Sequence, residues 1–188
     1  MRALWISVAC CWGAPSAWAD EPPGGGLARL GVMVPLKDAY AGAQLGVTAD
    51  LGYWYEAPHF AIEPRVGFAT SADTTGDRRF YEVPADIGIF YVLPIGNVAL
   101  YAGGGAGVRY LYEFRREVVT VGQVIRTQHV AEREDKGFGF SAYGRAGVML
   151  LRNSSLSLMT SLGYSITLKT INERSNPQAV SAGVGLVF

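Results

Sequence analysis

Apolar and polar residues alternate one by one along most of this chain, from about residue 27 to the last residue. Between residues 43 and 55 the odd positions are Ala, Leu, Val, Ala, Leu, Tyr and Tyr, whereas the even positions up to 52 are Gln, Gly, Thr, Asp and Gly. A repeat of two places these sets on opposite faces of a β-strand. The pattern predicts eight strands, at 27–36, 43–55, 60–70, 81–93, 98–114, 138–150, 156–168 and 180–188.

The connections between these predicted strands alternate in length. Three are short and rich in turn-forming residues, at 56–59, 94–97 and 152–155. The others are longer, at 37–41, 71–79, 115–136 and 170–177. Short turns at one end and long loops at the other are typical of an up-and-down barrel in an outer membrane. We therefore expect an all-β fold: an eight-stranded antiparallel transmembrane β-barrel with short periplasmic turns and longer extracellular loops.

A soluble barrel also alternates, but its apolar face points inward. The face opposite the apolar one carries small residues here, with Gly103, Gly105 and Gly107 at consecutive inward positions and Gly183 and Gly185 near the end. Small side chains suit the narrow interior of an eight-stranded barrel better than a solvated surface. This composition favours the membrane barrel.

Aromatic residues on the apolar face gather at the two strand ends, which predicts two interfacial girdles around an apolar band. One group is expected at the short-turn end: Tyr53, Tyr55, Phe60, Tyr91 and Phe188. The other is expected at the long-loop end: Phe68, Tyr81, Tyr110, Tyr112, Phe114, Phe138 and Phe140. The core of a soluble barrel has no reason to separate its aromatics in this way.

The first residues read as a cleaved signal peptide over 1–19, with a basic start, an apolar run and a small-x-small motif that ends at Ala19. A short periplasmic segment, 20–26, then precedes the barrel domain, 27–188. Two alternatives are a retained anchor, although the apolar run is too short to span a bilayer as a helix, and lipidation at Cys10 or Cys11. Cleavage removes both cysteines, so the mature chain is expected to lack disulfides and thiolate metal sites.

The chain ends on Val184, Leu186 and Phe188 at alternate positions, which resembles the C-terminal assembly signal of bacterial outer-membrane proteins. With the strand pattern, this ending resembles the eight-stranded barrels typified by the transmembrane domain of outer membrane protein A, outer membrane protein X and the opacity-type proteins. The resemblance covers essentially 27–188 and implies a location in the cell outer membrane. It implies as partners outer-membrane lipid and lipopolysaccharide, together with the barrel assembly machinery and periplasmic chaperones during biogenesis.

Ten charged residues fall on the predicted inward face. They are Arg29, Asp50, Glu63, Arg65, Glu82, Asp86, Arg109, Glu113, Arg145 and Lys169. Equal numbers of each sign predict ion pairs that plug a narrow lumen, because an unpaired buried charge is costly; a gated polar pore is the alternative. Placing Tyr55 opposite Phe60 and Leu93 opposite Val98 predicts the pairs Asp50–Arg65 and Glu82–Arg109, with Arg29 sharing Asp50.

Two prolines, Pro64 and Pro84, lie inside predicted strands, where each removes a ladder donor. Pairing outward from the loop at 71–79 places them nearly side by side. We therefore expect a local bulge or break in the sheet at this level.

No catalytic, cofactor or metal site is predicted. The chain has two histidines, and both His59 and His129 fall in connections without a partner serine held on a strand. Lys plus Arg and Asp plus Glu are equal at 16 each, so no nucleic-acid surface is expected. Residues 115–136 exceed the needs of a connection; their alternation around Gly122 suggests a hairpin above the membrane, either an extracellular partner surface or a variable loop.

These observations predict a small outer-membrane barrel with a structural or surface-interaction role and no enzymatic activity. A narrow channel for small solutes is the first alternative. A lipid-modifying outer-membrane enzyme, which this architecture also supports, is the second.

Overall fold

The computed structural model describes residues 24–36, 45–73, 75, 77–121, 127–171 and 174–188. The predicted signal peptide at 1–19, with Cys10 and Cys11, lies outside these residues. The strands are β1 (Gly25–Leu36), β2 (Leu45–Glu56), β3 (Phe60–Ala72), β4 (Arg78–Ile95), β5 (Val98–Val121), β6 (Thr127–Leu150), β7 (Ser157–Leu168), β8 (Thr170–Ile171), β9 (Arg174–Ser175) and β10 (Gln178–Val187).

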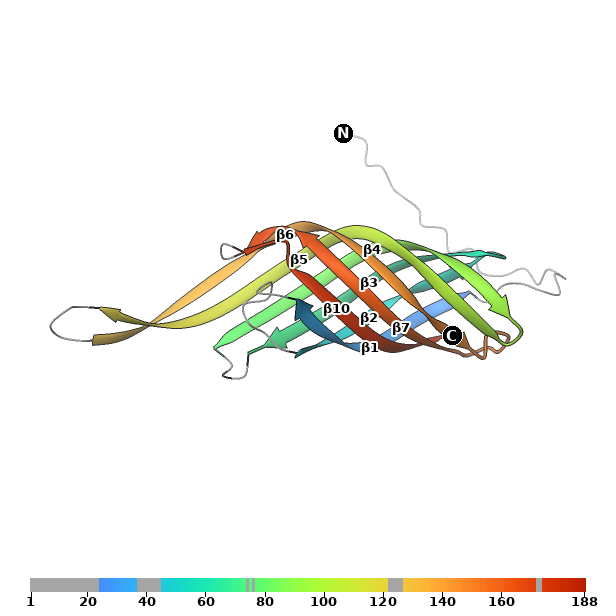
Figure 1. Ribbon diagram of the computed structural model, residues 1–188, viewed down its shortest axis with the longest axis horizontal. Coiled ribbons are helices and arrows are strands. Elements are labelled where there is room, and N and C mark those ends of the chain that lie inside the picture. Colours follow the sequence, from blue (N-terminus) through green and yellow to red (C-terminus); the bar gives the residue numbers. More distant parts are fainter. Residues whose placement is uncertain (1–23, 37–44, 74, 76, 122–126, 172–173) are drawn as a thin grey trace, which may run out of the picture.

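Eight of these strands form a closed barrel in the order β1-β10-β7-β6-β5-β4-β3-β2, and every neighbouring pair is antiparallel. The predicted fold class is therefore confirmed. Figure 1 shows the tilted strands of the ring, with the C-terminus at the end opposite the long extension of β5 and β6. β8 and β9 form a separate two-stranded hairpin inside the connection at 170–177, which the pattern did not predict.

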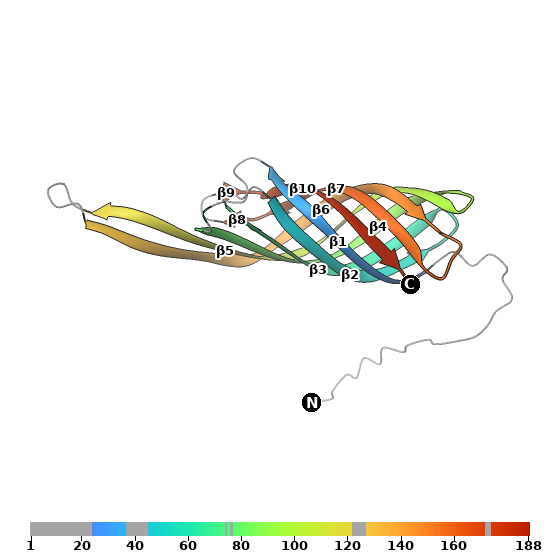
Figure 2. The same cartoon turned by 90° about the horizontal axis from the view of Figure 1, so that it is seen from below.

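The third long connection is mostly sheet. β5 and β6 each have 24 residues and pair without interruption from Val98 opposite Leu150 to Val121 opposite Thr127. β4 accompanies β5 only as far as Arg115, and β7 accompanies β6 only from Phe140 downward. The hairpin interpretation of residues 115–136 is thus confirmed, and this hairpin projects alone beyond the rim (Figure 2).

The outer face of the barrel is apolar. Large side chains on it are exposed, by 67% for Leu30, 66% for Leu162 and 72% for Phe140, as expected where lipid rather than water surrounds the protein. Aromatic rings meet at both ends: Phe60 packs against Tyr91 at the short-turn end with centroids 5.8 Å apart, and Phe68 packs against Tyr81 at the long-loop end at 6.1 Å. Within the described residues, no helix is long and apolar enough to cross a bilayer.

The two prolines each interrupt the sheet on one side. Pairing between β2 and β3 lapses between Gly52–Arg65 and Tyr55–Ile62, at the level of Pro64. Pairing between β3 and β4 lapses between Val66–Ala85 and Ala69–Glu82, at the level of Pro84. The register is the same on both sides of each gap, so the predicted break is confirmed and no extra residue is inserted as in a bulge. The side-by-side placement is wrong, since Pro64 lies opposite Ile87.

The barrel closes where β1 meets β10, and the last residue completes this seam. The backbone N–H of Phe188 donates to the carbonyl of Gly26 at 2.9 Å. The Phe188 ring lies so close to Gly26 that a Cβ there would approach it to 2.9 Å. A side chain at Gly26 would therefore displace the ring. Val184, Leu186 and Phe188 all face outward, with 57%, 41% and 65% exposure.

Candidate functional site: the lumen

Inward-facing side chains fill the lumen in layers. Along β4, inward positions pass from Phe80 through Glu82 and Asp86 to Phe90, all less than 6% exposed. Phe80 belongs to an apolar cluster near the long-loop end, with Met33, Ala69, Leu111, Ile171 and Ala179. Phe90 belongs to a larger one near the short-turn end, with Leu27, Trp54, Ala61, Val92, Ala99, Tyr101, Tyr143, Met149, Met159 and Val187. The charged residues lie between the two clusters.

Glu63 is the most enclosed member of the charged layer, with 0% exposure. Its carboxylate accepts hydrogen bonds from Arg29 Nη2 at 2.9 Å and from Arg145 Nη1 at 2.7 Å. The guanidinium of Arg65 lies 4.0 Å away through Nε. Because burial without partners is expensive for an ion, this arrangement stabilises all of these charges together.

The remaining charges extend the same network toward the long-loop end. Arg65 donates to Asp50 Oδ2 at 3.2 Å and to Asp86 Oδ2 at 2.8 Å. Asp86 also accepts from Ser141 Oγ at 2.8 Å and lies 3.7 Å from Arg109, which pairs with Glu82. Four arginines and four carboxylates are thus linked into one neutral cluster across six strands. They are Arg29, Arg65, Arg109 and Arg145 with Asp50, Glu63, Glu82 and Asp86.

The ion pairs Asp50–Arg65 and Glu82–Arg109 are present, and Arg29 shares Asp50 at 3.5 Å. The registers from which they were predicted are wrong by two residues. Arg65 lies opposite Gly52, and Arg109 lies opposite Pro84. The pairs form nevertheless, because an arginine is long enough to reach a diagonal neighbour on the next strand.

The register error arises in the turns. β4 and β5 continue to Ile95 opposite Val98, so the connection is the two-residue turn Gly96–Asn97 and not the four-residue turn 94–97. Gly96 has a φ of +62°, a conformation that glycine adopts without steric cost and that suits such hairpins. Likewise β2 and β3 continue to Glu56 opposite Ala61. Each turn is centred one residue later than predicted, which shifts the pairing by two.

A second set of contacts lies at the short-turn mouth, and sequence reasoning missed it. Arg152, in the turn between β6 and β7, reaches across to Glu56 at the end of β2, with Nη2 2.8 Å from Oε1. The other oxygen of Glu56 accepts from Trp54 Nε1 at 2.9 Å. Trp54 is fully buried, and its ring packs 5.5 Å from those of Phe90 and Tyr101. Alternation alone places Trp54 and Glu56 inward with Asp50, but no pattern pointed to Arg152.

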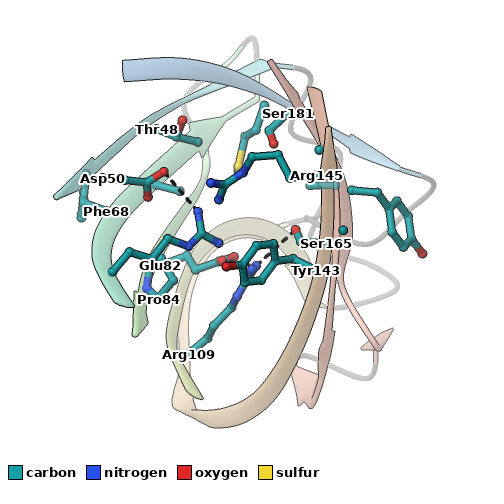
Figure 3. Close-up of a pocket in the computed structure, with 17 residues that line it drawn as sticks. Thr48, Asp50, Phe68, Glu82, Pro84, Arg109, Tyr143, Arg145, Ser165 and Ser181 are labelled. Atoms are coloured by element: carbon teal, nitrogen blue, oxygen red, sulfur yellow. Dashed lines mark hydrogen bonds and ion pairs between the residues drawn. The ribbon is translucent and has the colours of Figure 1, made fainter. Parts of the chain in front are cut away.

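The space left in the lumen is small. A cavity of about 60 Å³ lies above the charged layer, next to Arg65, Arg109 and Arg145. Figure 3 shows Arg109 and Arg145 pointing into this space; Arg109 pairs with Glu82 and donates to Ser165, whose Oγ lies 3.2 Å from Nη1. Met33 and Ala179 line the same cavity and belong to the apolar cluster on its long-loop side. The volume suits a few water molecules.

Two predicted lumen charges lie outside the cluster. Glu113 is 2% exposed on β5, and its Oε1 has no hydrogen-bond partner among the described residues. The amino group of Lys169 lies against Gly137. In the described part of the chain, neither forms an ion pair with the charged cluster.

The histidines give no catalytic geometry. His59 lies in the short turn after β2, where its ring stacks on Tyr91 with centroids 6.3 Å apart. The side chain of His129 lies outside the described part. Among the described residues, no group of three or more His, Cys, Asp or Glu side chains is placed to hold a metal ion.

A closed antiparallel ring with an apolar outside, aromatic ends and a packed polar interior defines a transmembrane β-barrel.

No family model matches the chain, and no curated protein matches its sequence. The solved structures that share the fold include three outer-membrane proteins. Neisserial surface protein A has a TM-score of 0.57 at 15% identity and covers 88% of this chain and 97% of its own. Ail of Yersinia pestis has a TM-score of 0.52 at 15% identity over 90% and 100%. A major outer membrane protein of Thermus thermophilus has a TM-score of 0.52 at 15% identity over 88% and 99%. The chain therefore has the fold of the eight-stranded outer-membrane β-barrels.

Proposed function

We propose that this chain is a closed outer-membrane barrel with a structural and surface-interaction role. In this proposal the lumen does not conduct, and the barrel is an anchor that holds the β5–β6 hairpin outside the cell. The short turns face the periplasm, so Arg152 and Glu56 close the periplasmic mouth. Lipid and lipopolysaccharide contact the outer face, and the assembly machinery and periplasmic chaperones act on the C-terminal strand during biogenesis.

The observation that carries this proposal is the layered filling of the lumen. A solute would have to pass the Trp54 cluster, a neutral cluster of eight buried charges and the Phe80 cluster in turn. Moving one charge of a satisfied cluster leaves its partner buried and unpaired, which is strongly unfavourable. The narrow interior of an eight-stranded barrel has no room for a bypass.

Ion conductance across planar lipid bilayers tests this proposal. Purified wild-type protein is expected to give no stable conductance steps. The double variant Trp54→Ala with Phe80→Ala removes the largest ring from each apolar cluster, so transient openings are expected. Phe60→Ala with Phe68→Ala removes rings from the outer face at similar heights and is expected to stay silent. A steady, ohmic wild-type conductance would favour the channel alternative.

A further inference from the structure

We propose that the free edge of β6 above the barrel pairs with the same edge of a second copy held in a facing membrane. This inference rests on the proposed function, which places the β5–β6 hairpin outside the cell. Within the described residues, no strand pairs with residues 127–139 on the side of β6 away from β5, because β7 joins only at Phe140. An edge strand of this kind offers a row of unpaired N–H and C=O groups to another strand.

The order of charges along this edge indicates what it fits. Residues 132–136 read Glu-Arg-Glu-Asp-Lys. In an antiparallel pair of two such edges centred on Glu134, Glu132 faces Lys136 of the other copy and Arg133 faces Asp135. Two-fold symmetry repeats both contacts, so four opposite-charge pairs form. Only Glu134 faces a like charge, the Glu134 of the other copy. Opposite charges at facing positions stabilise antiparallel pairs, whereas like charges destabilise them.

Charges on an edge strand usually keep other strands away. These charges can nevertheless attract a strand whose charges are opposite at each facing position. A second copy of this chain, paired antiparallel, is such a strand. Glu132, Glu134 and Lys136 are exposed. Glu132 is paired with Arg116 within the hairpin at 2.9 Å, but both side chains remain more than half exposed, so the carboxylate can still meet a second cation.

The direction of pairing decides where the second copy lies. Two barrels in one membrane have parallel β6 strands, and edge-to-edge contact in register then places each charge opposite itself. Antiparallel pairing needs copies that point at each other, as in two facing membranes. Glu134 lies beyond Phe140 by about 20 Å of extended strand. Pairing centred on it can extend over residues 129–139 and ends where β7 joins β6 at Phe140. The interface is a two-fold one that uses the same patch on both copies.

Clustering of phosphatidylcholine vesicles that carry the full-length protein tests this inference, with turbidity and light scattering as readouts. Wild-type vesicles are expected to cluster. Glu132→Lys makes positions 132 and 136 both positive and Lys136→Glu makes them both negative, so vesicles of either variant alone should cluster about tenfold less, as expected for many weak contacts acting together. An equal mixture of the two populations should cluster like wild type, because opposite charges face each other again.

The control is Arg79→Glu, which reverses an exposed charge on β4 away from this edge and should leave clustering unchanged. Trp54 emission confirms that each variant is folded. Wild-type vesicles that stay dispersed, single variants that cluster normally, or a mixture that clusters no better than its components would each overturn the inference. Bilayer conductance is independent of this edge, so a dispersed but non-conducting protein would contradict this inference alone and not the proposed function.

Discussion

Replacing Glu63 with glutamine is expected to lower the free energy of unfolding by about 3–5 kcal/mol. The variant keeps the shape of the side chain but removes the negative charge that Arg29 and Arg145 share. Arg29 still has Asp50 at 3.5 Å, whereas Glu63 is the carboxylate that binds Arg145. Both guanidinium groups are less than 8% exposed, so water cannot replace the lost partner.

The matched control is the double variant Glu63→Gln with Arg145→Gln, which restores the balance of charge. It should cost less than the single variant, because no arginine is left without its partner. Urea unfolding in lipid vesicles measures both. Trp54 is the only tryptophan after residue 19, so it is the only source of tryptophan emission in a chain cleaved at the predicted site. A double variant that is less stable than the single one would contradict the network as described.

Replacing Leu51 with arginine is expected to cost about 2–4 kcal/mol, the usual cost of a basic residue facing lipid near the bilayer midplane. Leu51 follows Asp50 of the charged layer, and its side chain points outward with 63% exposure. Ile95 is equally exposed, at 58%, but lies at the short-turn end of β4. Ile95→Arg should therefore cost only about 0–1 kcal/mol, as near an interface.

The difference between these two positions is the informative quantity, and the same urea unfolding assay measures it. If water instead of lipid surrounded the barrel, arginine at either position would change the stability equally little, since both side chains are exposed on the outer face. Equal stabilities of Leu51→Arg and Ile95→Arg in lipid would contradict the placement of Leu51 at mid-depth.

The strands could be predicted well from sequence because lipid outside and a packed lumen inside impose a strict two-residue repeat. Strand ends were less predictable where this constraint stops. Two strands were expected to end at 114 and to begin at 138, with a hairpin between them, whereas in the structure β5 and β6 themselves continue past the rim into that hairpin. The two-residue repeat still indicates a hairpin there, but it is less strict than in the barrel because the hairpin does not separate lipid from lumen.

Pairing was harder to predict than strands, because a shift of one residue in a turn moves every partner by two. Asp50–Arg65 and Glu82–Arg109 survived that error only because arginine is long. Glu63 was assigned to the lumen, but its central position between Arg29 and Arg145 depends on side-chain reach across the barrel, which no local pattern encodes.

The contact between Arg152 and Glu56 at the short-turn mouth was missed for a related reason. Tyr53 and Tyr55 were assigned to the aromatic girdle on the outer face. Alternation places Trp54, which lies between them in the sequence, on the inward face, but this position was not used. Arg152 lies in a turn, where alternation carries no information. Its position follows from the packing of two turns, since its backbone N–H donates to the Asn97 carbonyl at 3.1 Å.

The central claim, that both ends of the lumen are closed, is tested most directly by the reactivity of one cysteine placed inside it. With Cys10 and Cys11 in the predicted signal peptide, the mature chain is expected to have no other thiol. Ser181→Cys puts a thiol on the wall of the lumen cavity next to Arg109 and Arg145. Ser155→Cys puts one on the exposed turn between β6 and β7. In protein folded in lipid vesicles, a small charged methanethiosulfonate should modify Ser155→Cys at once and Ser181→Cys only after unfolding. Adding Phe80→Ala, which opens the long-loop cluster, should make the inner thiol reactive. Rapid modification of Ser181→Cys in the otherwise unaltered barrel would show that the lumen is open and would contradict the claim.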